Sequence, residues 1–394
     1  TGLHTANLRL DAPDIIDAGG GAIDVNAVNS ILFKSGSAET VNITAQQFDG
    51  TALGSDFVIN NDSPALELVD LNEDNLSLTG GTDTNISLSS AGSITVSDLV
   101  QTLGTGTLFL ETTNTDADLT LNHSLLSDTG SVTISTANDI IFNGTTNLTS
   151  TSGAVSLTAD ADNGAGGLLG GITMADGTFI NAGDGAVSLI ASDDIVLSQI
   201  ITTNNTNSAI LIDTDSSLVD AGDSTGEDLI ANESGARVTI IASLGAGKVA
   251  DLNGHLETHI NQINVTNQTA GEIRIIETDD LIVHNLIQST AGDIEVFTTG
   301  NILLNGLIET VSDNVLLDSK AAIIDQNDGV PGELNIHATS LDMNAVTGIG
   351  TGDTLEMSVE TFSADSTNGD ILLHNTATTG VTATSITTGT GNIN

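Results

Sequence analysis

Acidic side chains are the residues of this chain that could most readily do chemistry, because 52 Asp and Glu stand against 6 Lys and Arg, a formal net charge of −46. The segment Asp160-Ala-Asp162-Asn-Gly has the spacing that opens a calcium loop, but the Glu that would close such a loop is missing from its place. The acids between residues 213 and 228 form a second group of oxygen ligands for a divalent cation. The candidate metal ligands are Asp160, Asp162, Asp213, Asp215, Asp220 and Asp223, followed in sequence by Glu227 and Asp228. We expect no obligatory cofactor; calcium is the one ion these residues could hold, and a solvated acidic loop is the alternative.

Three further patterns could indicate a catalytic or metal site. His255 and His259 would face one metal only if they lay on a helix, and no helix is expected there. The pairs 193–194 and 279–280 are adjacent Asp residues that could act as the acid and base of a glycosidase, but neighbouring residues on a strand point to opposite faces. Residues 222–226 match Gly-x-Ser-x-Gly without the strand-to-helix turn that a nucleophile needs. We therefore expect no catalytic residues and no enzymatic activity.

The overall composition excludes several classes of partner. Six scattered cations cannot neutralise a phosphate backbone, so no nucleic acid is expected. The absence of Cys removes disulfides and thiolate metal sites, and no apolar run approaches the ~18 residues of a membrane span. With 39% hydrophobic residues the chain is too apolar to remain disordered. We expect a folded chain, either processed or cut from a longer polypeptide.

A short repeat organises much of the sequence. Its unit is Gly, any residue and an apolar-polar-apolar triplet, with a second apolar triplet eight residues later, as in 132–134 and 140–142. The unit recurs at a constant step through Ile273, Ile294 and Val315, and at slightly longer steps elsewhere. A third apolar pair gives three short strands per period, at offsets of roughly 0, 8 and 13.

Such a unit cannot bury its own apolar face, so successive units must stack. Equivalent residues then pair in parallel register, with flanking residues such as Ile294 and Val296 inside and Glu295 outside. The sequence therefore predicts an all-β, right-handed parallel β-helix with about 21–23 residues and three short strands per turn, or about 19 turns in all. An antiparallel sandwich or a row of Ig-like domains would need longer strands or core aromatics, and only 2% of residues are aromatic.

Asn or Asp precedes the second strand of several units, which predicts a left-handed residue or a turn cap at Asp139, Asp194, Asp280 and Asn301. A longer duplication is also present, because Leu256-Glu257 is echoed roughly 100 residues later by Leu355-Glu356. The predicted organisation is irregular or capping turns (1–90), β-helix shaft (91–212), an acidic loop-rich insertion or broad turns (213–256), and shaft with the internal duplication (257–394).

The repeat text resembles that of a known group of proteins. The segments 292–306 and 348–375 are similar to the repeat regions of filamentous-haemagglutinin-like giant bacterial adhesins and secreted β-helix exoproteins. The resemblance implies an extracellular or cell-surface protein of a Gram-negative bacterium that works in adhesion, surface fibres or biofilm matrix. It allows host or environmental glycans or proteins as partners. Other copies of the chain, end to end, are further expected partners, because an uncapped terminal strand pairs readily with another chain. The alternatives are a β-helix polysaccharide-degrading enzyme and a calcium-dependent matrix-binding protein.

Overall fold

The fold is an all-β parallel β-solenoid of about 14 turns with about 23 residues per turn, which confirms the predicted class. The structure is a computed structural model that describes the whole chain except residues 1–2, 12–22, 36–38, 53–55, 72–73, 162–168, 223–225, 248–253, 328–332 and 379. The described residues contain no helix and hence none that could cross a membrane. The expectation of about 19 turns is wrong because some turns are much longer than the repeat period. Ile140, for example, pairs directly with Ile172 of the next turn.

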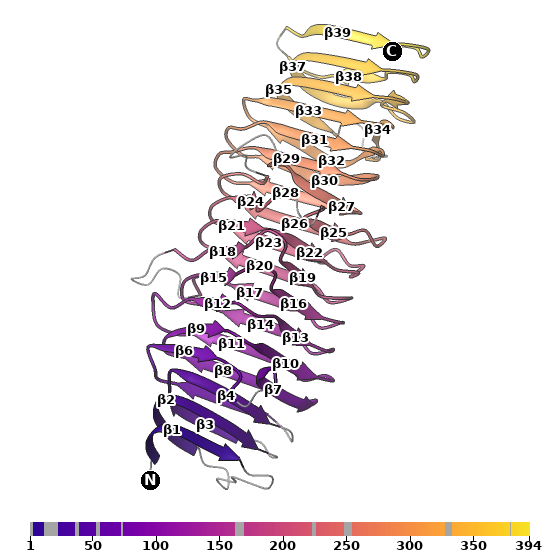
Figure 1. The fold of residues 1–394 in the computed structure, drawn as a ribbon. Coiled ribbons are helices and arrows are strands. Elements are labelled where there is room, and N and C mark those ends of the chain that lie inside the picture. Colours follow the sequence, from indigo (N-terminus) through magenta and orange to yellow (C-terminus); the bar gives the residue numbers. More distant parts are fainter. Residues whose placement is uncertain are drawn as a thin grey trace. The chain divides into compact units, whose positions relative to one another are not determined.

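The chain forms two compact units, residues 1–204 and 205–394. Figure 1 labels their strands. The strands of the first unit are β1 Leu3–Asp11, β2 Ile23–Ser35, β3 Glu39–Thr44, β4 Gln47–Ala52, β5 Phe57–Asn61, β6 Ala65–Leu68, β7 Leu76–Thr82, β8 Ile86–Ser90, β9 Ser93–Val96, β10 Leu99–Leu103, β11 Leu108–Thr112, β12 Leu119–Leu121, β13 Leu125–Ser127, β14 Val132–Ser135, β15 Ile140–Phe142, β16 Asn147–Ser150, β17 Val155–Thr158, β18 Ile172–Met174, β19 Phe179–Asn181, β20 Val187–Ala191, β21 Ile195–Leu197 and β22 Gln199–Ile201. Those of the second unit are β23 Ile210–Thr214, β24 Leu218–Asp220, β25 Leu229–Ala231, β26 Arg237–Ala242, β27 Leu256–Ile260, β28 Gln262–Asn267, β29 Ile273–Glu277, β30 Leu281–Gln288, β31 Ile294–Thr298, β32 Ile302–Thr310, β33 Asn314–Ser319, β34 Ala322–Asp325, β35 Ile336–Ala345, β36 Gly348–Ile349, β37 Leu355–Ser366, β38 Leu373–Asn375 and β39 Thr382–Thr388.

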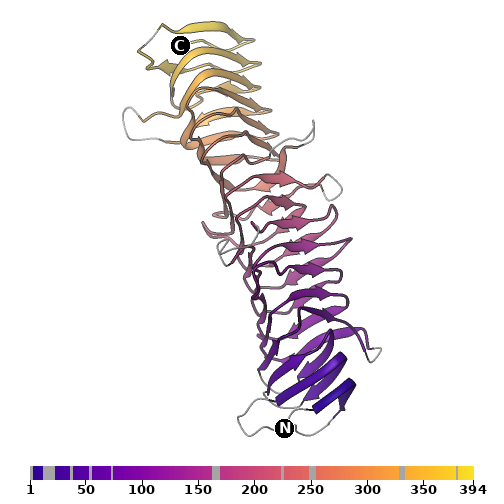
Figure 2. The ribbon, with the colours of Figure 1, turned by 90° about the vertical axis from the view of Figure 1, so that its left-hand side faces the viewer.

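In much of the first unit a turn consists of three short strands. β14, β15 and β16 pair in parallel with β17, β18 and β19 of the next turn. Identical positions stack, so that Leu108, Val132, Val155 and Val187 form one column of buried side chains. Figure 2 shows the successive turns of this unit lying one on the next. The in-register stacking predicted from the repeat is confirmed.

In β30 and β32 of the second unit, the predicted second and third strands of a turn run together. β30 holds both predicted segments, Leu281 to Val283 and Leu286-Ile287, in one strand of 8 residues. The pairing register shifts between Val283 and Asn285, and His284 and Asn285 are both half-buried, which interrupts the alternation of buried and half-buried residues. The solenoid therefore changes direction here without leaving the strand.

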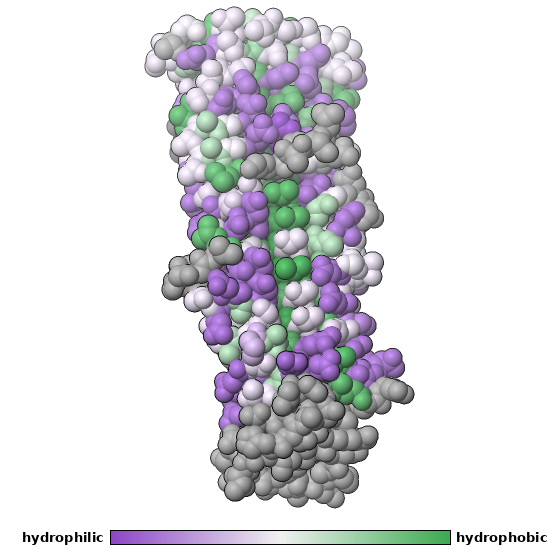
Figure 3. Space-filling view, turned by 60° about the vertical axis from the view of Figure 1, so that its left-hand side comes forward, coloured by the Kyte–Doolittle hydropathy of each residue, from purple (hydrophilic) through white to green (hydrophobic). Residues whose placement is uncertain are grey.

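The interior is mainly aliphatic and the exterior mainly polar. Ile294 and Val296 are fully buried, whereas Glu295 between them is half-buried and lies beside Arg274. On the face drawn in Figure 3, hydrophilic and near-neutral side chains surround narrow strips of hydrophobic ones. This division follows from the alternation of side-chain directions along a strand.

Glycine occupies a crowded corner of the turns. At Gly292, φ is +144°, and a Cβ built on this residue would lie 1.8 Å from the carbonyl oxygen of Gly271 in the preceding turn. In the first unit a Cβ on Gly130 would lie 1.9 Å from the carbonyl oxygen of Gly106. The glycine before each triplet is thus required because the backbone of the neighbouring turn fills the space of a side chain.

Polar side chains also connect successive turns. Asn301 donates both its backbone N–H (2.7 Å) and its amide Nδ2 (3.0 Å) to Oδ1 of Asp280. Asn314 makes the same two contacts with Asp293. The residues before the second strand therefore act as acceptors between turns. Of the two roles predicted for these residues, the left-handed conformation is wrong, because Asn75, Asp83 and Asp160 are the non-glycine residues with positive φ in the described part of the chain.

Candidate functional site

The structure separates the two predicted groups of acids. Asp160 is buried at 6% exposure with φ of 57°, and its carboxylate accepts a hydrogen bond from the Ser192 hydroxyl of the next turn. Asp162 and Asp223 lie outside the described residues. Asp213 is half-buried on β23, where burial and the charge of Asp215 raise the pKa of its carboxyl.

Of the predicted ligands, Asp220 is the one brought into a cluster of acids within the described chain. It ends β24 and lies with Asp228 and Glu257 so that one carboxylate oxygen of each is within 4.8 Å of the others. Asp228 directly precedes β25, and Glu257 is the second residue of β27. Because Leu229 pairs with Thr258 in parallel register, Asp228 stacks on Glu257 of the next turn. The backbone N–H of Asp228 donates to the carbonyl oxygen of Glu257 at 2.7 Å.

Asp228 is the most deeply buried member of this cluster, with no exposed surface. Its Oδ2 accepts the backbone N–H of Glu257 at 3.1 Å, but its Oδ1 has no hydrogen-bond partner among the described residues. Burial, with the charges of Asp220 and Glu257, raises the pKa of Asp228 to about 9. Such a cluster has two chemical outcomes. It either retains a shared proton or binds a cation that compensates its charge.

No known protein family, curated protein or solved structure matches this chain. The site must therefore be interpreted from its own geometry.

Sequence reasoning missed Glu257 as a partner of the acids before residue 228. The two stacked acids are far apart in the sequence, because this turn is longer than the repeat period. An alignment of Leu229 with Thr258 would have placed Asp228 beside Glu257. That alignment can be made only once the register between this irregular turn and the next is known.

The other candidate groups do not converge. His255 Nε2 lies 3.4 Å from Glu295 Oε2, whereas His259 Nε2 lies 3.3 Å from Asp279 Oδ2. The imidazole of His259, on β27, and that of His255, directly before this strand, thus have different partners. Asp280 accepts from Asn301 in the next turn, while its neighbour Asp279 faces His259. Of the Gly-x-Ser-x-Gly segment, Ser224 lies outside the described residues.

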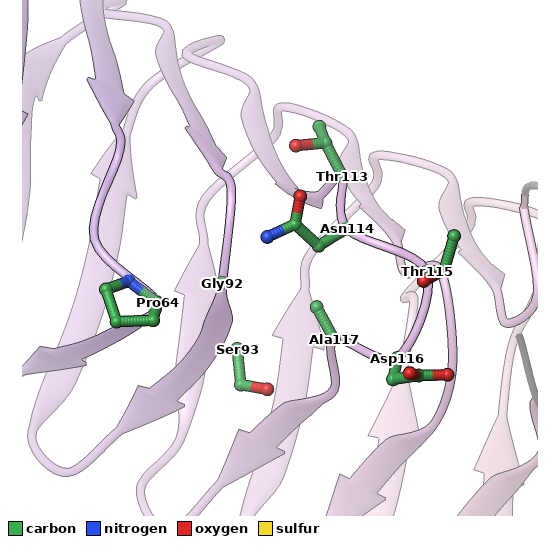
Figure 4. Close-up of a pocket in the computed structure, with 8 residues that line it drawn as sticks. All are labelled: Pro64, Gly92, Ser93, Thr113, Asn114, Thr115, Asp116 and Ala117. Carbon is green, nitrogen blue, oxygen red and sulfur yellow. The ribbon is translucent and has the colours of Figure 1, made fainter.

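A surface hollow of about 430 Å³ lies in the first unit (Figure 4). The Asn114 side chain points toward Pro64 and Gly92, and the carboxylate of Asp116, its one acidic residue, points away from them. The lining is Pro64, Gly92, Ser93, Thr113, Asn114, Thr115, Asp116 and Ala117. A hollow with one averted carboxylate offers no acid and base pair.

Glu277 is a second fully buried carboxylate of the same unit, but it is well supplied with donors. It accepts from the Thr258 hydroxyl at 2.8 Å and from the backbone N–H groups of Ile260 at 3.1 Å and Thr278 at 2.9 Å. Burial raises the pKa of Glu277 to about 8, against the lowering effect of the Thr258 and Ile260 hydrogen bonds. This residue acts as a cap inside the solenoid.

Proposed function

We propose that this chain is a non-catalytic, extracellular structural segment of a filamentous-haemagglutinin-like bacterial adhesin or matrix filament. The observation that carries the proposal is the in-register stacking of turns, in which Ile273, Ile294 and Val315 pair successively around a filled aliphatic interior. Each turn supplies the hydrogen-bonding edge of the next, which suits a segment that bears load. The repeat text supports the family and the surface location.

The mechanical role is tested by pulling on the chain in single-molecule force spectroscopy. If turns are the load-bearing units, extension occurs in steps of about 23 residues, which is roughly 80 Å of extended chain. A single low-force event that releases the whole chain would contradict a load-bearing role. The polysaccharide-degrading alternative is tested by incubation with acidic and neutral polysaccharides, where release of unsaturated or reducing ends would overturn the non-catalytic proposal.

End-to-end association of copies is part of this proposal. Strand edges readily add a further strand, while a net charge of −46 opposes lateral clumping. A concentration series with sedimentation and electron microscopy tests the association, and a chain that stays monomeric without filaments would exclude it.

A further inference from the structure

The second unit contains two corners of the same local construction, which lie in different columns of stacked strands. In the first, Asp220 ends β24, Asp228 precedes β25, and Glu257 lies one turn further. In the second, the equivalent residues are Asp325 at the end of β34, Asn335 directly before β35, and Glu356 in β37. Leu229 pairs with Thr258 in the first corner, and Ile336 pairs with Met357 in the second.

The backbone contacts of the two corners agree. Asn335 donates its N–H to Glu356 O at 2.9 Å and accepts the Glu356 N–H at Oδ1 (2.8 Å), as Asp228 does with Glu257. The first acid of each corner also caps the residue two positions on, at 2.7 Å in Asp220 and 2.8 Å in Asp325. The two sites therefore have the same construction.

The two corners differ in one side-chain atom of the residue before the strand, which is Asp228 in the first corner and Asn335 in the second. Nδ2 of Asn335 donates to Oδ1 of Asp325 at 2.9 Å, which completes the corner internally. Asp228 has a carboxylate oxygen where Asn335 has this amide group, and that oxygen lacks a hydrogen-bond partner in the described chain. Asp228 and Asn335 are both fully buried. A positive group must replace the amide donor if Asp228 is ionised.

The ligand set identifies the class of that positive group. The cluster offers carboxylate oxygens alone, which suits a hard divalent cation rather than zinc. Two ligand atoms on one Ca²⁺ lie at most about 4.6–5.2 Å apart, and on Mg²⁺ at most about 4.2 Å. Oxygens within 4.8 Å of one another lie inside the span of Ca²⁺, which tolerates irregular coordination, whereas Mg²⁺ demands a near-ideal octahedron. Asp220 and Glu257 are half-buried, so water can complete the coordination.

We propose that Asp220, Asp228 and Glu257 bind one Ca²⁺, which joins two successive turns of the second unit. The ion takes the place of the amide that closes the equivalent corner at Asn335. This site is additional to the structural function proposed above, which does not require it.

The test is calcium titration of the full chain by calorimetry at physiological ionic strength, where diffuse binding to the acidic surface is screened. The wild-type chain is expected to bind one Ca²⁺ at this site, with a Kd of about 0.1–1 mM, and to bind Mg²⁺ at least tenfold more weakly. Asp228→Asn, which copies the Asn335 corner, should lose this site and the calcium-dependent rise in Tm. Asp116→Asn removes the same charge from an exposed residue of the first unit and should keep both.

Loss of the site in Asp228→Asn but not in Asp116→Asn supports the proposal. Equal binding by Asp228→Asn and wild type overturns it, as does a wild-type chain without a saturable site. If either of these results overturns the proposal, an infrared band of a protonated carboxyl that disappears in Asp228→Asn would assign a shared proton to Asp228. Should Asp228→Asn fail to fold, Glu257→Gln serves as the second variant. Equal affinity for Mg²⁺ would overturn the assignment to calcium. None of these outcomes bears on load bearing or polysaccharide cleavage.

Discussion

The corners at Asp228 and Asn335 show how one atom changes the chemistry of a stacked turn. Both have the same backbone pairing and the same flanking acids, but an amide closes the corner at Asn335, whereas a carboxylate at Asp228 adds a charge. A repeat fold thus supplies the backbone geometry of a site at many turns. Small differences in side chains then decide at which turn a buried charge lacks a compensating group.

Asn335→Asp should have the largest effect, because it turns the closed corner into a copy of the acidic one. Keeping a buried Asp protonated at pH 7 lowers the free energy of unfolding by about 1.36 kcal/mol for each pH unit between the ordinary pKa of Asp and pH 7. The total is roughly 4 kcal/mol. We expect this loss of unfolding free energy in chelator by urea denaturation, together with a second Ca²⁺ site by calorimetry. Asn314→Asp, an exposed control, should cost less than about 1 kcal/mol. Equal losses in both variants would show that burial does not distinguish the corners.

Glu277 sharpens the comparison, because it is a buried acid whose carboxylate accepts several hydrogen bonds, with one acidic neighbour, Asp279. Its pKa is raised from 4.5 to about 8, so the native chain binds a proton that the unfolded chain has released between these values. Its stabilising contribution is complete below pH 4.5 and is lost as the pH rises through 8. Between pH 5 and 7 this loss is roughly 2–3 kcal/mol. Glu277→Gln should remove this share of the pH dependence, measured as the difference between variant and wild type; parallel curves would contradict it.

Asp220→Asn should stabilise the chain in chelator by about 1–2 kcal/mol, because its amide can donate to Asp228. The same substitution in the other corner, Asp325→Asn, should destabilise, because a neutral amide oxygen accepts the hydrogen bond of Asn335 Nδ2 less strongly than the carboxylate does. Thermal unfolding of the pair measures the two signs. If both variants change stability in the same direction, the two corners are not electrostatic opposites.

Asn301→Ala should have the smallest effect, since its ladder is exposed and complete without an ion. The variant loses the amide contact to Asp280 and the acceptor for the Ala322 N–H, which together are worth about 0.5–1 kcal/mol. Urea denaturation, with and without calcium, should give the same small loss. A calcium-dependent difference would place an ion in this ladder as well.

The repeat was sufficient to predict the fold because the spacing of its apolar triplets determines which residues stack on one another. Matching apolar triplets at Ile273, Ile294 and Val315 leave parallel stacking as the way to bury them. The merging of strands at His284 was not predictable, because a register shift needs no special residue. The number of turns was overestimated because long turns such as the one from Ile140 to Ile172 do not show the period.

The site was only partly accessible from the sequence. Asp220 and Asp228 stand out in an acidic segment, but many acids of this chain are simply solvated. What distinguishes Asp228 is its complete burial and its stacking on Glu257, and both depend on tertiary structure. The echo of Leu256-Glu257 in Leu355-Glu356 was visible, yet its meaning required the hydrogen bonds of Asn335.

The column of Leu108, Val132, Val155 and Val187 has a consequence for evolution of the chain. Each position of this column requires only a compact aliphatic side chain, and each turn contacts mainly the turns before and after it. Branched residues can therefore replace one another with little penalty, so such sequences diverge quickly while the architecture persists. Duplicated turns are then free to acquire separate properties.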